Sequence, residues 1–360
     1  RQRGESPQSF LFLIVCAHDR EGKGTKSFMR ITIKDISEIC GVSPGTVDRA
    51  LNNRPGINPK TKAKILETAR KLNYRPDHRA RSLAKGKTMT IGVILFDLRN
   101  RSFAQMMNGI EKRSREHGYF VDLALSGKDP KKEITLIDRL VQRNVDGLIL
   151  FTVNKGKEFE EYLQNLRLPI VTICNRLSDR WAYVGIDDRQ AMKDATLHAI
   201  SKGYERIIYI CPPLRKRQTI NIYTQEERLK GMLAGCEEGN LRHEPIIVQE
   251  KNYLDSLKRI DLRNGPRTAI LCSTDYYALE VMNMLQQLRI DIPGDVGLVG
   301  FDNVDFLKYV SPTLTTVEYA VEEIGERAVD SLVTELETGC RPEIPLLDYR
   351  LIEGASLQPN

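Results

Sequence analysis

Ser43, Thr46 and Arg49 follow one another at intervals of three residues, and their side chains can all recognise nucleic acid. Residues three apart on a helix share a face, so the three side chains would project together. The opposite face of that helix would be apolar, formed by Val47, Ala50 and Leu51. A guanidinium can bind O6 and N7 of guanine with two hydrogen bonds, and a hydroxyl can reach a phosphate or a base edge. The alternative is that Ser43 only caps the helix and Thr46 is only solvated.

A second set of candidate residues follows the apolar runs that predict strands. In doubly wound α/β folds, ligands bind beyond the carboxyl ends of the strands. Polar residues at these ends, an arginine near a helix start and one aromatic side chain are the predicted ligand contacts: Asp97, Phe103, Thr152, Arg176, Arg228, Asp275 and Asp302. Structural alternatives stay open for two of them, because Asp275 is also a good N-cap and Asp302 suits a turn.

No catalytic residue, metal ligand or cofactor site is predicted. The five histidines stand in no recognisable triad motif, and the seven cysteines contain no C-x-x-C pair. A G-x-G-x-x-G motif after a strand, a Walker loop and an H-E-x-x-H motif are all missing from the sequence. We therefore expect a binding protein and not an enzyme, with no cofactor. The odd, scattered cysteines favour a reducing, cytoplasmic compartment.

The residues that could recognise nucleic acid lie in a segment that predicts three short helices. Thr32, Ser43 and Asn58 are the expected N-caps, and Gly41 ends the first helix. Two helices of about eight residues joined by a tight turn match the helix-turn-helix geometry, in which the second helix enters the major groove.

The rest of the chain alternates strand and helix patterns. Short runs rich in Val, Ile and Leu predict eight strands, at 91–96, 120–125, 147–151, 169–174, 206–211, 245–248, 268–273 and 296–301. Amphipathic intervals predict helices at 103–117, 131–143, 192–202, 226–238 and 276–288. Eight strands are many for one sheet, and the interval from Ile173 to Arg189 lacks a helix. We therefore expect two Rossmann-like halves that join in this interval.

Charge is divided unequally along the chain. Residues 30–90 contain 14 Lys and Arg against 5 Asp and Glu, whereas residues 91–360 carry a net charge of −5. Such asymmetry indicates a polyanionic partner for the small basic segment, although a solvated basic surface is equally compatible with the charge alone.

The motifs resemble those of one known family. Residues 31–52, which read ITIKDISEICGVSPGTVDRALN, closely resemble the DNA-binding headpiece of the LacI/GalR family of bacterial transcription regulators. Residues 74–76 and 79–84 look like the hinge of that family. The resemblance continues through 90–93, Asp275, 299–302 and 311–316, so that it covers nearly all of residues 30–355.

The resemblance implies a small all-α helix-turn-helix headpiece and an α/β body of two Rossmann-like subdomains of the periplasmic-binding-protein-like type I. It adds Thr32 and Asn52 to the predicted DNA contacts. The complete set is Thr32, Ser43, Gly45, Thr46, Asp48, Arg49 and Asn52 in the headpiece and Arg79, Arg81 and Leu83 in the hinge, where Leu83 would wedge into the minor groove. The alternative for the hinge is a basic linker with Leu83 packed on the body. In sugar-sensing members, residues matching Arg228 and Asp275 hold ligand hydroxyls or stabilise the cleft, and Phe103 or Phe151 could stack on a sugar ring.

Two positions depart from the family pattern. Asp48 stands where a small hydroxyl residue is usual, and its carboxylate would repel phosphates but could accept a hydrogen bond from cytosine N4. Gly45 offers no side chain where relatives often read a base. The operator sequence therefore cannot be transferred from better-known members.

The expected organisation has four parts: residues 1–29 as an extension upstream of a native start near Met29, 30–76 as the helix-turn-helix domain, 77–88 as the hinge, and 89–355 as the effector-binding and dimerisation body.

The expected function is that of a homodimeric repressor that binds double-stranded operator DNA. A small effector, expected to be a carbohydrate, would control this binding, and no membrane partner is expected. The alternative is a periplasmic-type solute-binding receptor, which would suit the apolar run from Phe10 to Ala17 but has no use for a helix-turn-helix.

Overall fold

The computed structural model describes residues 31–75, 87–214 and 220–358 of the protein. The chain divides into two compact units, residues 1–81 and residues 82–360, which are described separately. The predicted N-terminal extension and the predicted hinge contacts Arg79, Arg81 and Leu83 lie outside the described residues.

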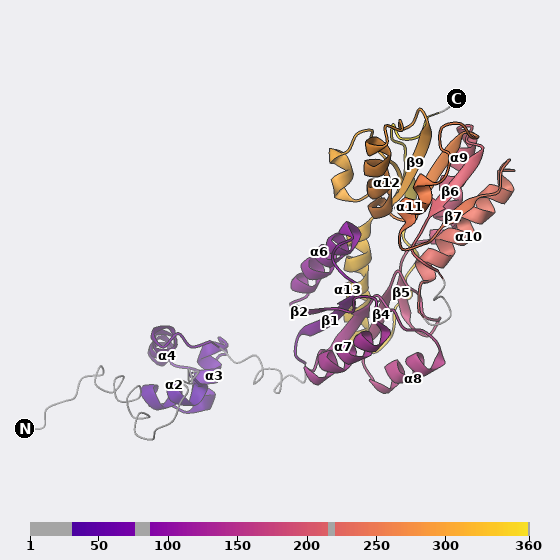
Figure 1. Ribbon diagram of the computed structural model, residues 1–360. Coiled ribbons are helices and arrows are strands. Elements are labelled where there is room, and N and C mark those ends of the chain that lie inside the picture. The colour runs from indigo at the N-terminus through magenta and orange to yellow at the C-terminus, as the bar shows by residue number, and fades with distance from the viewer. Residues whose placement is uncertain (1–30, 76–86, 215–219, 359–360) are drawn as a thin grey trace, which may run out of the picture. The chain divides into compact units, whose positions relative to one another are not determined.

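Within residues 31–75, the described part of the first unit, there are three helices: α2 (Ile33–Cys40), α3 (Pro44–Leu51) and α4 (Pro59–Lys71) (Figure 1). Thr32 and Asp35 form a reciprocal capping box at the start of α2, and Gly41 ends that helix in the left-handed conformation with φ 68°. One buried cluster joins the three helices: Ile36, Cys40, Val47, Ala50, Ile65 and Ala69. The helix-turn-helix prediction is confirmed for this segment.

The second unit begins with an N-terminal subdomain built on a parallel sheet in the order β2-β1-β3-β4-β5. Its strands are β1 (Thr90–Leu95), β2 (Phe120–Leu125), β3 (Gly147–Leu150), β4 (Ile170–Ile173) and β5 (Ala182–Val184). Helices α6 (Arg101–Glu116) and α13 (Val321–Thr338) contribute to the apolar cluster on one face of the sheet. Helices α7 (Pro130–Gln142) and α8 (Lys157–Asn165) contribute to the cluster on the other face. The alternating apolar residues of each strand thus face two separate cores.

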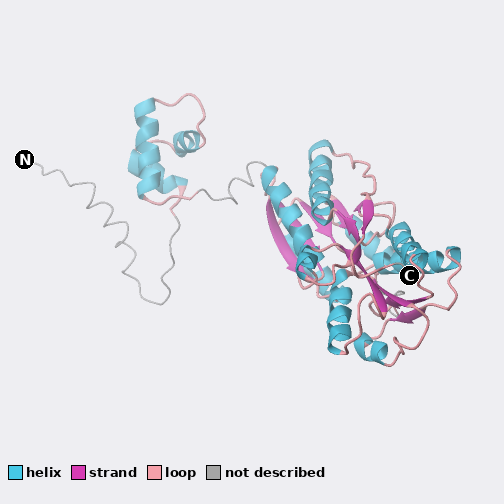
Figure 2. Cartoon of the chain, turned by 90° about the horizontal axis from the view of Figure 1, so that it is seen from above, coloured by secondary structure: helices cyan, strands magenta, loops and turns pink. Residues whose placement is uncertain are grey.

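The C-terminal subdomain contains a six-stranded sheet in the order β11-β10-β9-β8-β6-β7, in which only β11 runs antiparallel. Its strands are β6 (Arg206–Ile210), β7 (Ile246–Val248), β8 (Thr268–Cys272), β9 (Val296–Asp302), β10 (Thr315–Tyr319) and β11 (Tyr349–Ile352). The helices are α9 (Asp188–Ser201), α10 (Tyr223–Glu238), α11 (Tyr253–Lys258) and α12 (Asp275–Gln287), with a short 3-10 helix η1 (Asp305–Tyr309). Helices flank the strands of both subdomains in the second view as well (Figure 2).

The chain passes between the two subdomains three times: from β5 to α9, from β10 to α13, and from α13 to β11. The first passage is the one predicted between Ile173 and Arg189. The other two depend on β10, β11 and α13, which the sequence analysis did not predict. No helix among the described residues is long and apolar enough to cross a membrane.

Helices α9 and α10 pack closely because glycines of α10 stand at their contact. A Cβ atom on Gly231 would lie 2.1 Å from the carbonyl oxygen of Arg189, and one on Gly235 would lie 2.7 Å from Cβ of Thr196. The interhelical distance is therefore set by the absence of side chains at these two positions.

We predict that Gly231→Ala destabilises the body by about 1–3 kcal/mol or more, because the added methyl group overpacks the backbone of α9. Urea unfolding of the purified full chain measures this. Glu237→Ala on the exposed side of the same helix is the control, and it should change stability by less than about 0.5 kcal/mol. Equal stability of the Gly231→Ala variant and the wild type would contradict the packing argument.

Candidate functional site

Helix α3 presents the side chains that the sequence analysis assigned to DNA. Ser43 Oγ accepts a hydrogen bond from the backbone N–H of Thr46 at 3.3 Å and lies 3.0 Å from Thr46 Oγ1, so Ser43 is an N-cap and holds the Thr46 hydroxyl at the helix start. Arg49 is exposed, and its guanidinium has no hydrogen-bond or ion-pair partner among the described residues. A capped helix start and an unpartnered cation on one exposed face can bind an anionic, hydrogen-bonding surface.

Asp48, the charge that departs from the family pattern, is engaged within the unit. Its Oδ1 accepts a hydrogen bond from Asn52 Nδ2 at 2.7 Å, and its Oδ2 lies 3.3 Å from a guanidinium nitrogen of Arg54. These contacts offset part of the negative charge that would otherwise repel a phosphate. They also orient Asn52, whose Nδ2 donates to the carbonyl oxygen of Asp48 at 2.9 Å. Thr32 is occupied by the capping box with Asp35, and Gly45 is exposed.

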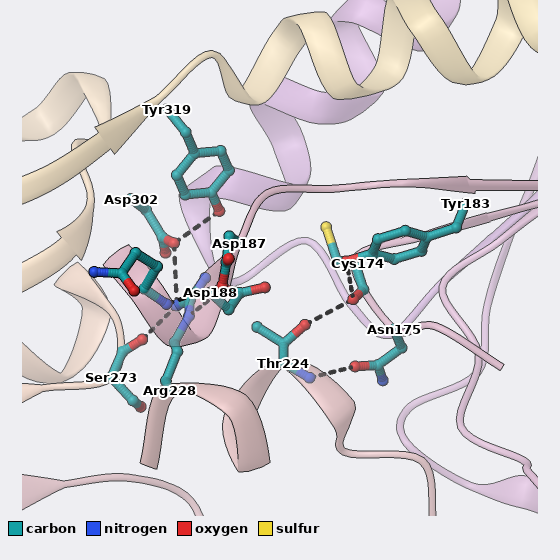
Figure 3. A network of polar contacts seen from close by, with 11 residues as sticks. Cys174, Asn175, Tyr183, Asp187, Asp188, Thr224, Arg228, Ser273, Asp302 and Tyr319 are labelled. Carbon is teal, nitrogen blue, oxygen red and sulfur yellow. Dashed lines mark hydrogen bonds and ion pairs between the residues drawn. The ribbon is translucent and has the colours of Figure 1, made fainter. Parts of the chain in front are cut away.

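In the body, Arg228 is buried near the start of α10 and contacts groups from three other elements (Figure 3). Its Nε donates to Asp188 Oδ1 at 2.7 Å, and one terminal nitrogen donates to the carbonyl oxygen of Ser273 at 2.5 Å and to Asp302 Oδ1 at 3.4 Å. The guanidinium carbon lies 3.6 Å from the ring centre of Phe301. Burial opposes the positive charge, but Asp188 and Asp302 more than offset this, so the pKa of Arg228 lies above its ordinary value.

The carboxylates around Arg228 titrate abnormally because they are buried. Burial raises the pKa of Asp188 to about 6, and the charge of Arg228 opposes that shift. Burial also raises the pKa of Asp275 to about 7, with the neighbouring Asp302 as the second cause. Asp275 is the first residue of α12 and not its N-cap; its Oδ2 accepts from the N–H of Val304 at 2.9 Å and its Oδ1 from Thr316 Oγ1 at 2.7 Å. It therefore fixes the turn that follows β9.

The remaining predicted ligand residues lie on the N-terminal subdomain. Thr152 is buried and its Oγ1 accepts a hydrogen bond from Asn221. Arg176 is exposed, with an ion pair to Asp179 at 2.6 Å. The Asp97 carboxylate accepts from the N–H of Arg99 within its own loop.

Phe103 contacts two other phenylalanines edge to face. Its ring centre lies 5.9 Å from that of Phe96 and 5.1 Å from that of Phe151. Both Phe96 and Phe103 pack against the N-terminal core, while Phe151 belongs to it. The three rings form an apolar cluster next to the ends of β1 and β3.

The structure thus pairs Arg228 with Asp302, and Asp275 lies near enough to Asp302 for that charge to raise its pKa. Thr152 and the backbone of Arg176 are connected through Asn221, and Asp97 is bonded only within its own loop among the described residues. The sequence analysis missed four residues that complete these groups: Asn175, Asp188, Asn221 and Tyr319. Asp188 could have been found from its place after the strand-like segment, whereas Asn221 follows no strand and carries no local signal.

Both parts of the chain are similar to known protein families. Residues 32–77 match the model of bacterial regulatory proteins of the lacI family, and residues 196–357 match a periplasmic binding protein-like domain. The HTH-type transcriptional regulator RegA of Clostridium acetobutylicum is 32% identical over 342 residues, which cover 91% of this chain and 99% of RegA.

Two solved structures share the fold. The lac repressor dimer bound to operator and the anti-inducer ONPF aligns with a TM-score of 0.77 at 21% identity, covering 91% of this chain and 100% of that one. A LacI family transcriptional regulator from Enterococcus faecium with bound ribose aligns with a TM-score of 0.65 at 21% identity, covering 75% of this chain and 99% of that one.

A capped helix-turn-helix followed by a body of two α/β subdomains defines a transcriptional regulator with an effector-binding domain. The chain belongs to the lacI family of bacterial regulatory proteins. Its relatives are transcriptional regulators, and the solute-receptor alternative is not favoured because the similarity to RegA extends over nearly the whole of both chains.

We predict that Arg228→Met destabilises the body by about 3–5 kcal/mol, because it leaves Asp188 and Asp302 buried without their cation. The matched control is Arg176→Met, which removes an exposed pair and should cost less than about 1 kcal/mol. Chemical unfolding of both variants measures the difference. Similar losses for the two would show that the buried group does not hold the body together.

Proposed function

We propose that the protein binds operator DNA as a homodimer through α3, and that a small polyhydroxylated ligand bound between the subdomains controls that affinity. The observation that carries the DNA-binding part is the exposed face of α3, on which the Thr46 hydroxyl is held by Ser43 and the Arg49 guanidinium has no partner among the described residues. Arg49 is the proposed base contact, and Thr32 and Asn52 are proposed backbone contacts. The proposed hinge contacts are Arg79, Arg81 and Leu83.

Dimerisation is proposed because one helix-turn-helix domain contacts only half of an operator. One helix-turn-helix reads only a half-site, and two copies related by a twofold axis match a near-palindromic operator. The solved lac repressor with the same fold is a dimer bound to operator, which supports this proposal. Repression is the proposed direction of control, and the cytoplasm is the proposed compartment because the DNA lies there.

A carbohydrate or carbohydrate derivative is the proposed ligand class. Carboxylate and guanidinium groups gather at Arg228, Asp275 and Asp302, and such groups hold vicinal hydroxyls. Phe103, which is partly exposed and contacts the buried ring of Phe151, is the aromatic side chain proposed to pack on a sugar face. The related regulator from Enterococcus faecium has bound ribose, which supports the same class.

Gel-shift assays with fragments of the source genome test the DNA-binding proposal. A subset of fragments should bind tightly at physiological salt, with an affinity that falls steeply as salt is raised. Uniform weak binding to every fragment would contradict it. A thermal-shift screen of sugars and sugar phosphates tests the ligand class, because a ligand that binds the native state raises the melting temperature.

We predict that Arg49→Ala weakens operator binding by about 1–3 kcal/mol and relaxes base preference at one position of each half-site. Arg70→Ala on α4 removes the same charge from an exposed position of the same unit and serves as the control. Binding to an operator library by each variant measures both effects. If Arg49→Ala weakens binding to all sequences equally, Arg49 contacts phosphate and not a base.

A further inference from the structure

The chain segment that leads into α10 is hydrogen-bonded to the opposite subdomain. The backbone N–H of Asn221 donates to the carbonyl oxygen of Val153, three residues after the end of β3, at 2.6 Å. Its side-chain Nδ2 donates to Thr152 Oγ1 at 2.8 Å and to the carbonyl oxygen of Arg176 at 3.2 Å. Helix α10 packs with α9 in the C-terminal subdomain, so each of these hydrogen bonds crosses from one subdomain to the other.

Asn175, which follows β4, makes the reciprocal contacts. Its Nδ2 donates to the carbonyl oxygen of Asn221 at 2.9 Å and to that of Thr152 at 2.9 Å. Its Oδ1 accepts from the backbone N–H of Thr224 at 3.3 Å, and Thr224 Oγ1 donates to the carbonyl oxygen of Cys174 at 2.9 Å (Figure 3). The Asn175 side chain therefore bonds to the backbone of residues 221 and 224 in the opposite subdomain. The Asn221 side chain bonds in return to Thr152 and to the backbone of Arg176.

Each of the two asparagine amides makes three hydrogen bonds, which use both N–H donors and the carbonyl oxygen. An asparagine amide has two N–H donors and one carbonyl acceptor. Asn175 uses both donors and its acceptor on the three partners given above. Asn221 does the same, because its Oδ1 accepts from the N–H of Tyr223 at 3.2 Å. Both residues are almost completely buried, with 2% and 3% of their surface exposed.

We propose that Asn175 and Asn221 form a lock, a set of buried hydrogen bonds that holds the two subdomains together. Separating the subdomains would require water to replace together the buried hydrogen bonds that cross the boundary, so the lock favours the joined arrangement. Thr152, which the sequence analysis assigned to the ligand, is a component of the lock.

A second connection between the subdomains lies on α6 and η1. Arg101 forms two parallel hydrogen bonds to Asp305, with Nε and a terminal nitrogen each 2.8 Å from a carboxylate oxygen. About one third of each side chain is exposed, so water screens this pair more than the buried amides. The buried asparagines are therefore the stronger of the two connections.

The lock does not depend on DNA binding or on the nature of the ligand, so it can be tested separately from the proposed function. The experiment is hydrogen exchange followed by mass spectrometry on the ligand-free full chain. In the wild type, the amides of Asn221 and Thr224 should exchange far more slowly than an exposed loop, because both donate to the opposite subdomain. Exchange at the rate of an exposed loop would overturn the proposal.

Asn175→Ala removes two of the hydrogen bonds that cross the boundary, those to Asn221 and Thr224, and should raise exchange at residues 221–224 by about tenfold or more, while β6 stays protected. Asn154→Ala is the matched control, because its side chain bonds only to Pro130 and Glu133 within the N-terminal subdomain. That variant should leave residues 221–224 unchanged. Unchanged exchange at 221–224 in Asn175→Ala, with β6 still protected, would overturn the lock.

If Asn175→Ala loses the protection of β6, the variant is unfolded and Asn221→Ala replaces it. Asn221→Ala loses the side-chain hydrogen bonds to Thr152 and to the carbonyl oxygen of Arg176. It keeps the hydrogen bond from its backbone N–H to Val153. Faster exchange of the Thr224 amide then supports the lock, and wild-type exchange rates overturn it.

Discussion

The buried positive charge of Arg228 is the constraint on which the arrangement of the body depends. A cation inside a protein must be neutralised and hydrogen-bonded, and here Asp188 and Asp302 supply the charge while Ser273 supplies a carbonyl oxygen. These partners come from the start of α9, the end of β9 and the residue after β8. Tyr319 OH donates to Asp302 at 2.8 Å, which connects the end of β10 to the same group.

This group lies where the chain passes between the subdomains. Asp188 stands at the first passage and Tyr319 at the second, so the charge pairing that stabilises α10 also fixes both passages. The segment that carries Asn221 leads into that same helix. A movement of α10 would therefore affect the lock and the passages together, which is the kind of two-state element that an allosteric regulator requires.

The chain from the DNA-binding unit enters the body beside β3. The backbone N–H of Thr88 donates to Asp146 Oδ1 at 2.8 Å, and that of Met89 donates to Oδ2 at 2.7 Å. Lys87 Nζ donates to the carbonyl oxygen of Leu336 on α13 at 3.3 Å. Because these contacts lie on the N-terminal subdomain, a rotation of that subdomain would also move the point at which the chain enters the body.

The sequence was sufficient to predict features that depend only on residues close together in the chain. The caps at Thr32 and Ser43, the stop at Gly41 and the eight apolar strands depend on neighbouring residues, and each was predicted. Helix α13 was missed although its pattern is amphipathic. The lock was missed because Asn175 and Asn221 are 46 residues apart and gain their role only when the subdomains meet. Asp302 and Asp188 both contact Arg228. The place of Asp188 after a strand-like segment was a usable signal, but its pairing with Arg228, 40 residues away, depends on the packing of α9 with α10.

The central claim is that ligand binding in the body and operator binding by α3 are coupled. Thermodynamic linkage requires each ligand to change the affinity of the other by the same factor. The most direct measurement is the operator dissociation constant with and without a saturating sugar ligand, together with the sugar dissociation constant with and without operator. We predict that both constants change by the same factor, about 5- to 150-fold. A sugar that binds the body tightly but leaves the operator dissociation constant unchanged would contradict the account.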